Sequence, residues 1–401
     1  MSSLLSTLGR AGRALWWWLD TTRRALLNLL FVALLAALAW GLLRSGPPAL
    51  QPKTALVLDL SGRISEQRPA SSRSTLLRRL QGDEDGGARL RDLLAVIDAA
   101  AKDPAITQAL LLTDDLGAAG LPTLRELAAA LQRFKAAGKP VVAWGADFDQ
   151  RGYYLAAQAS EVWLHPMGSI HLQGYGRLRS YYKDLLDKVG VTAHVIRAGR
   201  FKNAGETYTA STPSAETQES DAALYGALWA SWTTGVEQAR RQPAGSVMQA
   251  VDSLPASLEA AGGDFAAWAL QRRWVDALKT RDEMRTALVA RGAPEGDEPA
   301  AAGTAGRATT FRQVHWREYL ARVQPKTDGD AVGVVVAEGG ISNGRAGPGR
   351  IGGLSTAELI RQARNDERIK ALVLRVNSPG GATFGSELVR RELEQIGRAH
   401  V

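Results

Sequence analysis

The sequence of 401 residues contains no cysteine, which excludes disulfides, thiolate nucleophiles and cysteine-based metal sites. Its five histidines show neither the HExxH spacing nor another arrangement typical of metal ligands. We therefore expect no metal site and no cofactor. The lack of cysteine fits an oxidising compartment as well as the cytosol, so it does not locate the protein.

The basic residues also do not form a continuous stripe. The formal net charge is +8, but basic residues are mixed with acidic ones, except for Arg10, Arg13, Arg23 and Arg24 near the N-terminus. A protein that binds single-stranded nucleic acid shows basic residues interleaved with aromatic ones, and this sequence has no such stretch. The charge pattern argues against nucleic acid as a partner and favours a membrane surface.

The uncharged run from Ala25 to Leu43 has 19 residues, ALLNLLFVALLAALAWGLL. A helix of this length spans about 28 Å, close to the thickness of the hydrocarbon core of a bilayer. The arginine excess before the run places residues 1–24 in the cytoplasm and the bulk of the chain across the membrane. We predict a transmembrane anchor over residues 25–43. The alternative is a cleaved signal peptide, since Ala37 to Ala39 reads Ala-Leu-Ala, although the apolar run continues past that site.

Two parts of the chain share one pattern of strand, helix, apolar strand and turn. In the first part, LLAVIDAAAKDPAI and TQALLLT lead to DDLG; in the second, LIRQARNDERI and KALVLRV lead to NSPGG. At one constant offset Asp103 matches Asp366, and Gly117 matches Gly380. Strands that alternate with helices at this spacing indicate βα units with right-handed crossovers. The sequence therefore predicts two α/β domains of one fold.

The boundaries follow from composition. We expect the first domain over residues 54–289, a linker region rich in Ala, Gly and Pro within 290–329, and the second domain over 330–401. The first copy continues for 100 or more residues beyond the point at which the second stops. A domain without its remaining strands would expose an apolar sheet edge, so we expect the second domain to be incomplete.

Two segments carry residues suited to catalysis. NSPGG, residues 377–381, follows an apolar strand, where Gly380 and Gly381 allow backbone N–H groups to approach an oxyanion. GRFKNAGE, residues 199–206, places Lys202 between a glycine turn and a polar run, and Thr212 with Pro213 predicts the start of a following helix. A lysine acts as a base at neutral pH only when burial or a nearby cation lowers its pKa. The alternatives are a Pro-Gly turn without function and a solvated surface lysine.

These segments resemble bacterial signal peptide peptidases of the protease IV type in their long, two-domain form. GRFKNAGE in the first domain and GGLSTAELIRQARNDERIKALVLRVNSPGG in the second carry the resemblance. It implies tandem Clp/crotonase-like α/β domains behind an inner-membrane anchor. It also implies a periplasmic serine endopeptidase with a Ser/Lys dyad that degrades cleaved signal peptides and other short apolar peptides. Lys202 would be the general base and Gly380 and Gly381 would line the oxyanion hole.

The resemblance also shows a departure. The family's serine lies in a turn after the strand that follows NSPGG, which residues 1–401 do not include, and the equivalent turn of the first domain reads DQRGYY, with Gln150 in the serine's place. An amide is no nucleophile, so we expect this polypeptide alone to be inactive. Gly168 to Ile170 and the pair Tyr153 and Tyr154 match family positions, and we interpret them as turn and core residues.

Three functions remain open at this stage. The first is the membrane-bound endopeptidase, for which the resemblance implies a homo-oligomer, a tetramer, around the active sites. The second is a catalytically silent membrane-bound scaffold or partner-binding protein of the same fold. The third is a crotonase-type enzyme that stabilises a thioester enolate with the glycine N–H groups, against which the predicted anchor argues.

Overall fold

A computed structural model describes residues 2–44, 49–67, 87–295, 310–323 and 329–399. The chain divides into two compact units, Met1–Leu50 and Gln51–Val401. The first unit is one long helix, α1 (Ser2–Arg44). Among the residues that the structure describes, no helix is both long and apolar enough to cross a membrane. Residues 25–43 are helical, as predicted, because they lie within α1. The predicted transmembrane span is not confirmed.

The second unit contains a six-stranded parallel sheet with the order β10-β8-β6-β4-β1-β11. Its strands are β1 (Thr54–Asp59), β4 (Ile106–Leu112), β6 (Val141–Gly145), β8 (Glu161–Leu164), β10 (Ala277–Leu278) and β11 (Gln313–His315). The central strands are apolar on both faces, as expected of a parallel sheet covered on two sides. The α/β fold class is confirmed.

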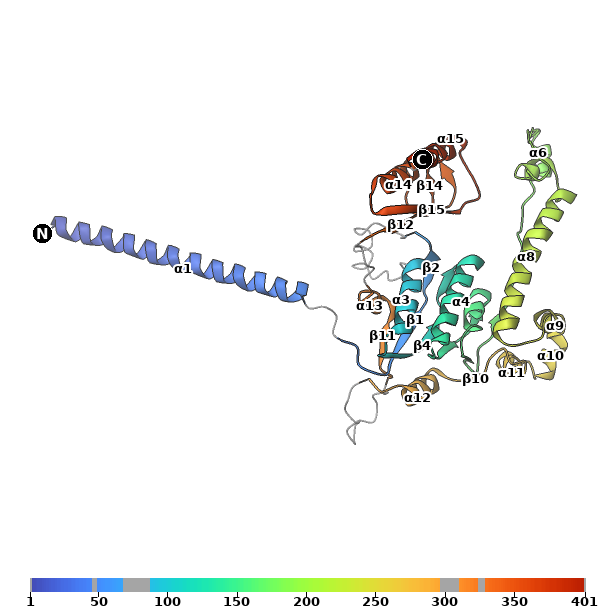
Figure 1. Ribbon diagram of the computed structural model, residues 1–401, viewed down its shortest axis with the longest axis horizontal. Coiled ribbons are helices and arrows are strands. Elements are labelled where there is room, and N and C mark those ends of the chain that lie inside the picture. Colours follow the sequence, from blue (N-terminus) through green and yellow to red (C-terminus); the bar gives the residue numbers. More distant parts are fainter. Residues whose placement is uncertain (1, 45–48, 68–86, 296–309, 324–328, 400–401) are drawn as a thin grey trace. The chain divides into compact units, whose positions relative to one another are not determined.

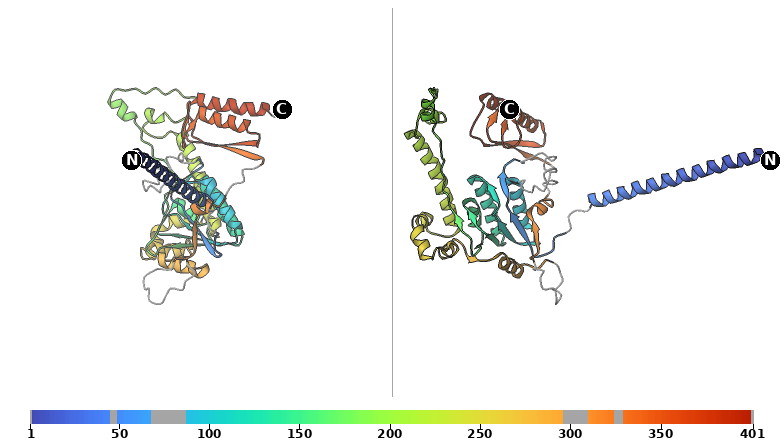
Figure 2. Two further views of the ribbon diagram at one scale, coloured as in Figure 1. Left: turned by 90° about the vertical axis from the view of Figure 1, so that its left-hand side faces the viewer. Right: turned by 180° about the vertical axis from the view of Figure 1, so that it is seen from behind.

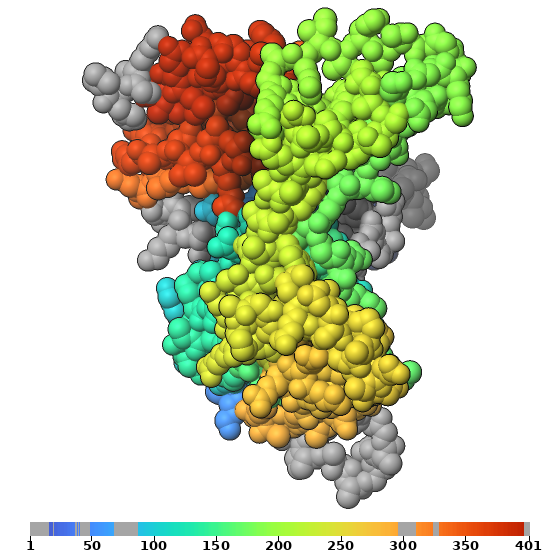
Figure 3. All heavy atoms as spheres, turned by 90° about the vertical axis from the view of Figure 1, so that its right-hand side faces the viewer, coloured from blue at the N-terminus to red at the C-terminus, as the bar shows by residue number. Residues whose placement is uncertain are grey.

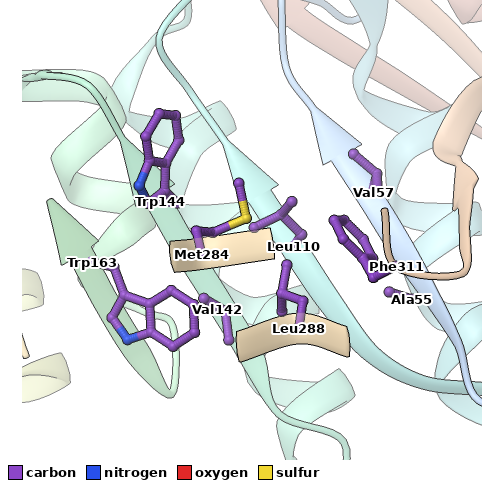
Figure 4. Close-up of a cluster of buried hydrophobic side chains, with 9 residues drawn as sticks. All are labelled: Ala55, Val57, Leu110, Val142, Trp144, Trp163, Met284, Leu288 and Phe311. Atoms are coloured by element: carbon purple, nitrogen blue, oxygen red, sulfur yellow. The ribbon is translucent and has the colours of Figure 1, made fainter. Parts of the chain in front are cut away.

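Helices cover both faces of this sheet (Figure 1). On one face α12 (Arg281–Arg291) presents Met284 and Leu288 to Val142 and Leu110 (Figure 4), and a capping box of Thr280 and Glu283 fixes its first turn. The other face is covered by α3 (Leu90–Lys102), α4 (Leu121–Ala136) and α5 (Gln150–Ala156), whose buried leucines meet those of β1 and β4. The sheet is thus the middle layer of three.

Part of the expected linker region belongs to this sheet. Strand β11 pairs with β1, and α13 (Trp316–Leu320) packs against α3 and β1. Phe311 and Trp316 are buried, and the indole N–H of Trp316 donates to the carbonyl oxygen of Asp59 at 3.0 Å. Residues 310–320 are therefore part of the first domain. The composition of the region concealed this, because the segment is short and follows residues rich in Ala and Gly.

The second repeat has the same local architecture. Strands β12 (Ala331–Glu338) and β15 (Ile369–Asn377) pair in parallel as β1 and β4 do, and both pairs shift register after their first residue. Helices α3 and α14 (Gly353–Asn365) both have 13 residues. The two segments thus share the parallel pairing of two strands, its register shift and the length of one helix. Within the described residues this second sheet has two strands, and Val332, Val334, Val373 and Val376 along it are exposed.

An arm leads away from the first sheet (Figure 2). It consists of residues 172–214 with α6 (Lys183–Lys188) and α7 (Glu206–Thr209), together with the long helix α8 (Ala215–Ala239). Figure 3 shows it in green and yellow-green, leading away from the yellow helices α9 to α11. Many of its apolar side chains are exposed, including Leu178, Leu185, Val189, Val191 and Ile196. The arm therefore carries apolar surface that no described residue covers.

The remaining described elements are β2 (Gly62–Ser65), β3 (Ala88–Arg89), β5 (Leu116–Ala118), β7 (Phe148–Asp149), β9 (Ile170–His171), α9 (Ser246–Asp252), α10 (Leu254–Ala260), α11 (Phe265–Gln271), β13 (Ile341–Ser342), β14 (Ile351–Gly352) and the longer helix α15 (Thr383–Ala399). In the two repeats β2 pairs with β3 and β13 pairs with β14, in parallel in both cases.

Candidate functional site

The lysine loop, residues 199–206, lies in the arm just before α7. It turns at Gly199, whose φ of +101° favours glycine, and the N–H of Lys202 donates to the carbonyl oxygen of Gly199 at 3.3 Å. The side chain of Lys202 is exposed, as are Phe201 and Ala204 beside it. The loop itself therefore does not bury this lysine, which in the single chain is the solvated surface lysine named above as an alternative. Burial would require atoms from elsewhere, because the neighbouring side chains also face solvent.

Two polar side chains of the same loop are buried instead. Asn203 accepts a hydrogen bond from Arg197 at 3.4 Å, and Glu206 is 8 % exposed. The Glu206 carboxylate accepts from Ser214 N at 2.8 Å, Ser214 Oγ at 2.7 Å, Thr217 Oγ1 at 2.6 Å and Tyr181 Oη at 3.3 Å. Burial opposes its ionisation, but these hydrogen bonds outweigh burial and lower the pKa of Glu206 to about 2. Glu206 closes the GRFKNAGE motif, but its burial could not be predicted from that position.

The helix after the loop begins slightly later than expected. Ser214, not Thr212, is the N-cap of α8, and its hydroxyl accepts from the N–H of Thr217 at 3.3 Å. The same hydroxyl donates to Glu206. The cap of α8 and the end of the lysine loop are therefore one hydrogen-bonded cluster.

The second candidate segment, the turn at residues 377–381, is held by hydrogen bonds of its own backbone and of Ser378. Ser378 Oγ donates to the carbonyl oxygen of Gly339 at 2.7 Å and accepts from the N–H of Gly380 at 3.1 Å. The carbonyl oxygen of Gly380 accepts from the N–H of Ile341 at 3.0 Å. Only glycine fits at Gly381, since a Cβ there would lie 2.3 Å from the carbonyl oxygen of Ile341.

The two glycines therefore differ as oxyanion donors. The N–H of Gly380 is engaged by Ser378, whereas that of Gly381 has no hydrogen-bond partner among the described residues and lies at an exposed position. A free backbone N–H at the carboxyl end of a parallel strand is the geometry that an oxyanion donor requires. The structure therefore favours the N–H of Gly381 over that of Gly380 as an oxyanion donor.

Gln150 occupies the turn of the first domain that corresponds to the expected serine position. It is 8 % exposed; its Oε1 accepts from the N–H of Gln173 at 3.0 Å and of Gly174 at 2.7 Å, and its Nε2 donates to the carbonyl oxygen of Gly174 at 3.2 Å. Asp149 caps α5 by accepting from the N–H of Gly152 at 2.7 Å. The Gln150 amide thus fixes the segment after β9 and has no reactive oxygen to offer.

Tyr153 and Tyr154 are core residues and Gly168 lies in a turn, as expected. Tyr153 is fully buried, stacks on Trp274 and donates to the carbonyl oxygen of Trp274 at 2.8 Å; burial raises its pKa. A Cβ at Gly168 would lie 2.1 Å from the carbonyl oxygen of Ala146, so the turn needs glycine. These residues support the fold around Gln150.

The structure brings the two repeats into contact but does not join the two candidate segments. Arg375 of β15 forms ion pairs with Glu66, at 2.7 Å, and with Glu126. No hydrogen bond or ion pair within the described part of the chain links residues 199–206 to residues 377–381. Lys202 and Gly381 are thus separate features of this single chain.

Comparisons with known proteins agree with a peptidase. Residues 133–291 match peptidase family S49. The chain is 33% identical over 392 residues to Protease 4 of Salmonella typhi, which covers 96% of this chain and 62% of that protein. It is 31% identical over 357 residues to Protease 4 of Haemophilus influenzae, which covers 87% of this chain and 56% of that protein. The chain thus spans somewhat more than half the length of these relatives.

Two more distant matches provide weaker evidence about the family and the fold. The chain is 25% identical over 376 residues to a chloroplastic serine protease SPPA of Arabidopsis thaliana, which covers 90% of this chain and 49% of that protein. Among solved structures, an enoyl-CoA hydratase/isomerase family protein from Silicibacter pomeroyi aligns with 46% of this chain and 86% of its own, at 15% identity and a TM-score of 0.19. At that TM-score the Clp/crotonase-like assignment stays a prediction.

Proposed function

We propose, from the premise that this chain carries a peptidase family S49 domain, that it is part of a membrane-attached serine endopeptidase with a Ser/Lys dyad. The observation that carries the proposal is the place of the lysine loop, which lies inside the matched residues 133–291. Lys202 is the general base, and the N–H of Gly381 is an oxyanion donor. The substrates are cleaved signal peptides and other short apolar peptides.

The chemistry assigns a separate task to each group. The lysine amine removes the proton of a serine hydroxyl as it attacks the peptide carbonyl, and returns the proton to the leaving amine. Negative charge that develops on the carbonyl oxygen is stabilised by the Gly381 N–H. Since Gln150 occupies the serine position of the first domain, the serine comes from the corresponding turn of the second repeat, which residues 1–401 do not contain.

Catalysis also requires that Lys202, which is exposed in the single chain, be shielded from solvent. A lysine acts as a base near neutral pH when desolvation lowers its pKa. The arm that carries Lys202 exposes much apolar surface, with Leu178 and Ile196 fully exposed. We infer that a second copy covers this surface in a homo-oligomer, a tetramer in the expected family arrangement, and so desolvates the amine.

Membrane attachment is assigned to α1. Its described apolar side chains, such as Leu29, Phe31 and Leu34, are all exposed and so are available to lipid. We infer an inner-membrane location with residues 1–24 in the cytoplasm and the peptidase units in the periplasm. Carbonate extraction of membranes tests attachment: the protein should stay in the pellet, and its release into the supernatant would refute insertion of α1.

The activity is tested on the enzyme as its gene encodes it. A fluorophosphonate probe should label one serine, and Lys202→Ala should abolish both the labelling and the hydrolysis of an apolar peptide. Lys183→Ala is the matched control, because Lys183 lies in the same arm and, within the described part of the chain, forms its ion pair with the exposed Asp187. Full activity of Lys202→Ala would refute the assignment of the base.

A second candidate is a catalytically silent scaffold of the same fold. It is favoured by the buried, hydrogen-bonded Gln150 amide and by the exposed Lys202. The same probe separates the two candidates. A silent scaffold shows no serine labelling in the wild-type protein, whatever residue is present at position 202.

A further inference from the structure

Glu206 is a buried carboxylate that lies four positions after Lys202 and has four hydrogen-bond donors around it. Two come from Ser214, one from Thr217 and one from Tyr181, at distances of 2.6 to 3.3 Å. Tyr181 precedes α6, and Ser214 and Thr217 start α8. The carboxylate therefore joins the end of the lysine loop to two separate parts of the arm.

The backbone of the loop is fixed on both sides of Lys202. On one side the N–H of Lys202 donates to Gly199 O at 3.3 Å; on the other, the N–H of Glu206 donates to the carbonyl oxygen of Asn203 at 3.1 Å. Gly205 packs so closely on Val195 that an added Cβ would lie 2.6 Å from a methyl carbon. These backbone contacts connect Lys202 to Glu206, whose side chain is bonded to α8 and to Tyr181.

Charge explains why this position is occupied by a carboxylate rather than by an amide. All four neighbours of the Glu206 oxygens are donors, and an ionised carboxylate is an acceptor at every lone pair. A glutamine would place an NH₂ group against some of these donors and leave them unsatisfied. The cluster is therefore specific for glutamate although Gln has the same shape.

We propose that Glu206 is a positioning residue for Lys202: its carboxylate, bonded to Ser214, Thr217 and Tyr181, sets the place from which the lysine amine reaches the serine. This inference rests on the proposed function, in which Lys202 is the base. Glu206 itself touches neither substrate nor serine. Since a base displaced by about 1 Å can slow catalysis by about 100-fold, the effect of losing this anchor falls on the chemical step.

The test compares Glu206→Gln with the wild-type enzyme as its gene encodes it, with the active sites titrated by exhaustive fluorophosphonate labelling. The kcat per titrated site should fall by about 10- to 100-fold, while KM for an apolar peptide stays within about twofold. A residue that only maintains the fold would lower the number of titratable sites and leave the kcat of each unchanged. An unchanged kcat per site would overturn the proposal.

Two further variants keep the test decisive if Glu206→Gln is poorly folded. Thr217→Val removes a single donor to the carboxylate and should produce a smaller loss of kcat in the same direction. Asp187→Asn is the matched control, since Asp187 is an exposed carboxylate of the same arm that pairs with Lys183 outside the lysine loop, and it should leave kcat unchanged. Equal effects of Thr217→Val and Asp187→Asn would overturn the proposal.

Hydrogen exchange separates this proposal from the proposed function. In Glu206→Gln the backbone amides of residues 203–217 should exchange at least tenfold faster, whether or not the protein is a peptidase. If Lys202→Ala retains activity while Glu206→Gln loosens the loop, the assignment of the base fails and the anchor remains. If Lys202→Ala is inactive and the exchange of Glu206→Gln is unchanged, the positioning inference alone fails.

Discussion

Phe311→Ala tests whether residues 310–320 belong to the first domain. Phe311 is 3% exposed and lies in the cluster of Ala55, Val57 and Leu110 on the face covered by α12 (Figure 4). If these residues were a linker, removal of the ring would have little effect on stability. If they are part of the sheet, the substitution opens a cavity in the core.

The magnitude follows from the burial of the ring. Burying a phenylalanine side chain stabilises a protein by about 1.5 to 3 kcal/mol, and the cavity that remains raises the total for Phe→Ala to about 3 to 5 kcal/mol. Strand β11 has three residues and lies at the edge of the sheet, so its backbone can move partly into the space. We therefore expect a loss of about 3 kcal/mol, at the lower end of that range.

Guanidinium unfolding followed by tryptophan fluorescence measures this loss, because Trp144 and Trp163 lie in the same cluster. Phe384→Ala is the matched control: the same ring is removed from a position that is 61% exposed, and the loss should stay below about 0.5 kcal/mol. Equal losses for the two variants would show that residues 310–320 do not contribute to the core, and the three-layer description would fail there.

Two other predictions concern buried polar groups. Tyr153→Phe leaves the carbonyl oxygen of Trp274 without its donor in a fully buried site, and should destabilise the chain by about 1 to 3 kcal/mol in the same assay; a change near zero would contradict the hydrogen bond. The folded-state pKa of Glu206, about 2, lies below its ordinary value of 4.5, so its contribution to stability is complete above about pH 4.5 and is lost as the pH falls toward 2. Unfolding measured across this interval should show a pH dependence that Glu206→Gln lacks; parallel curves would contradict the shift.

The strands and helices of the two repeats could be predicted because their signals are local. The apolar runs of β1, β4 and β6 and the periodicity of α3 and α14 each lie within one short window of sequence. Strand β11 could not be predicted in this way, since three residues at a sheet edge give no periodic signal. Its identity depends on pairing with β1, which is more than 250 residues away in the sequence.

In the candidate site, too, some features could be predicted from local sequence and others could not. Glycine at 381 could be predicted as a close backbone approach, and the structure supplies the neighbour, Ile341, that makes it necessary. The sequence left open whether Lys202 is buried or solvated, because burial depends on which other atoms cover a side chain and not on the residues beside it. The donors of Glu206 were missed for the same reason: three of the four come from residues 8 to 11 positions later, across a turn.

The valine side chains exposed along β12 and β15 affect how this 401-residue polypeptide behaves in solution. Val332, Val334 and Val373 form an apolar strip on one face of a two-stranded sheet and Val376 lies on the opposite face; a short sheet with exposed apolar side chains and open edges invites strands of another molecule to add to it. At the concentrations used for purification, the polypeptide should precipitate or form mixed aggregates unless detergent or a binding partner shields the strip. Low solubility on its own would therefore be no sign of misfolding in the first domain.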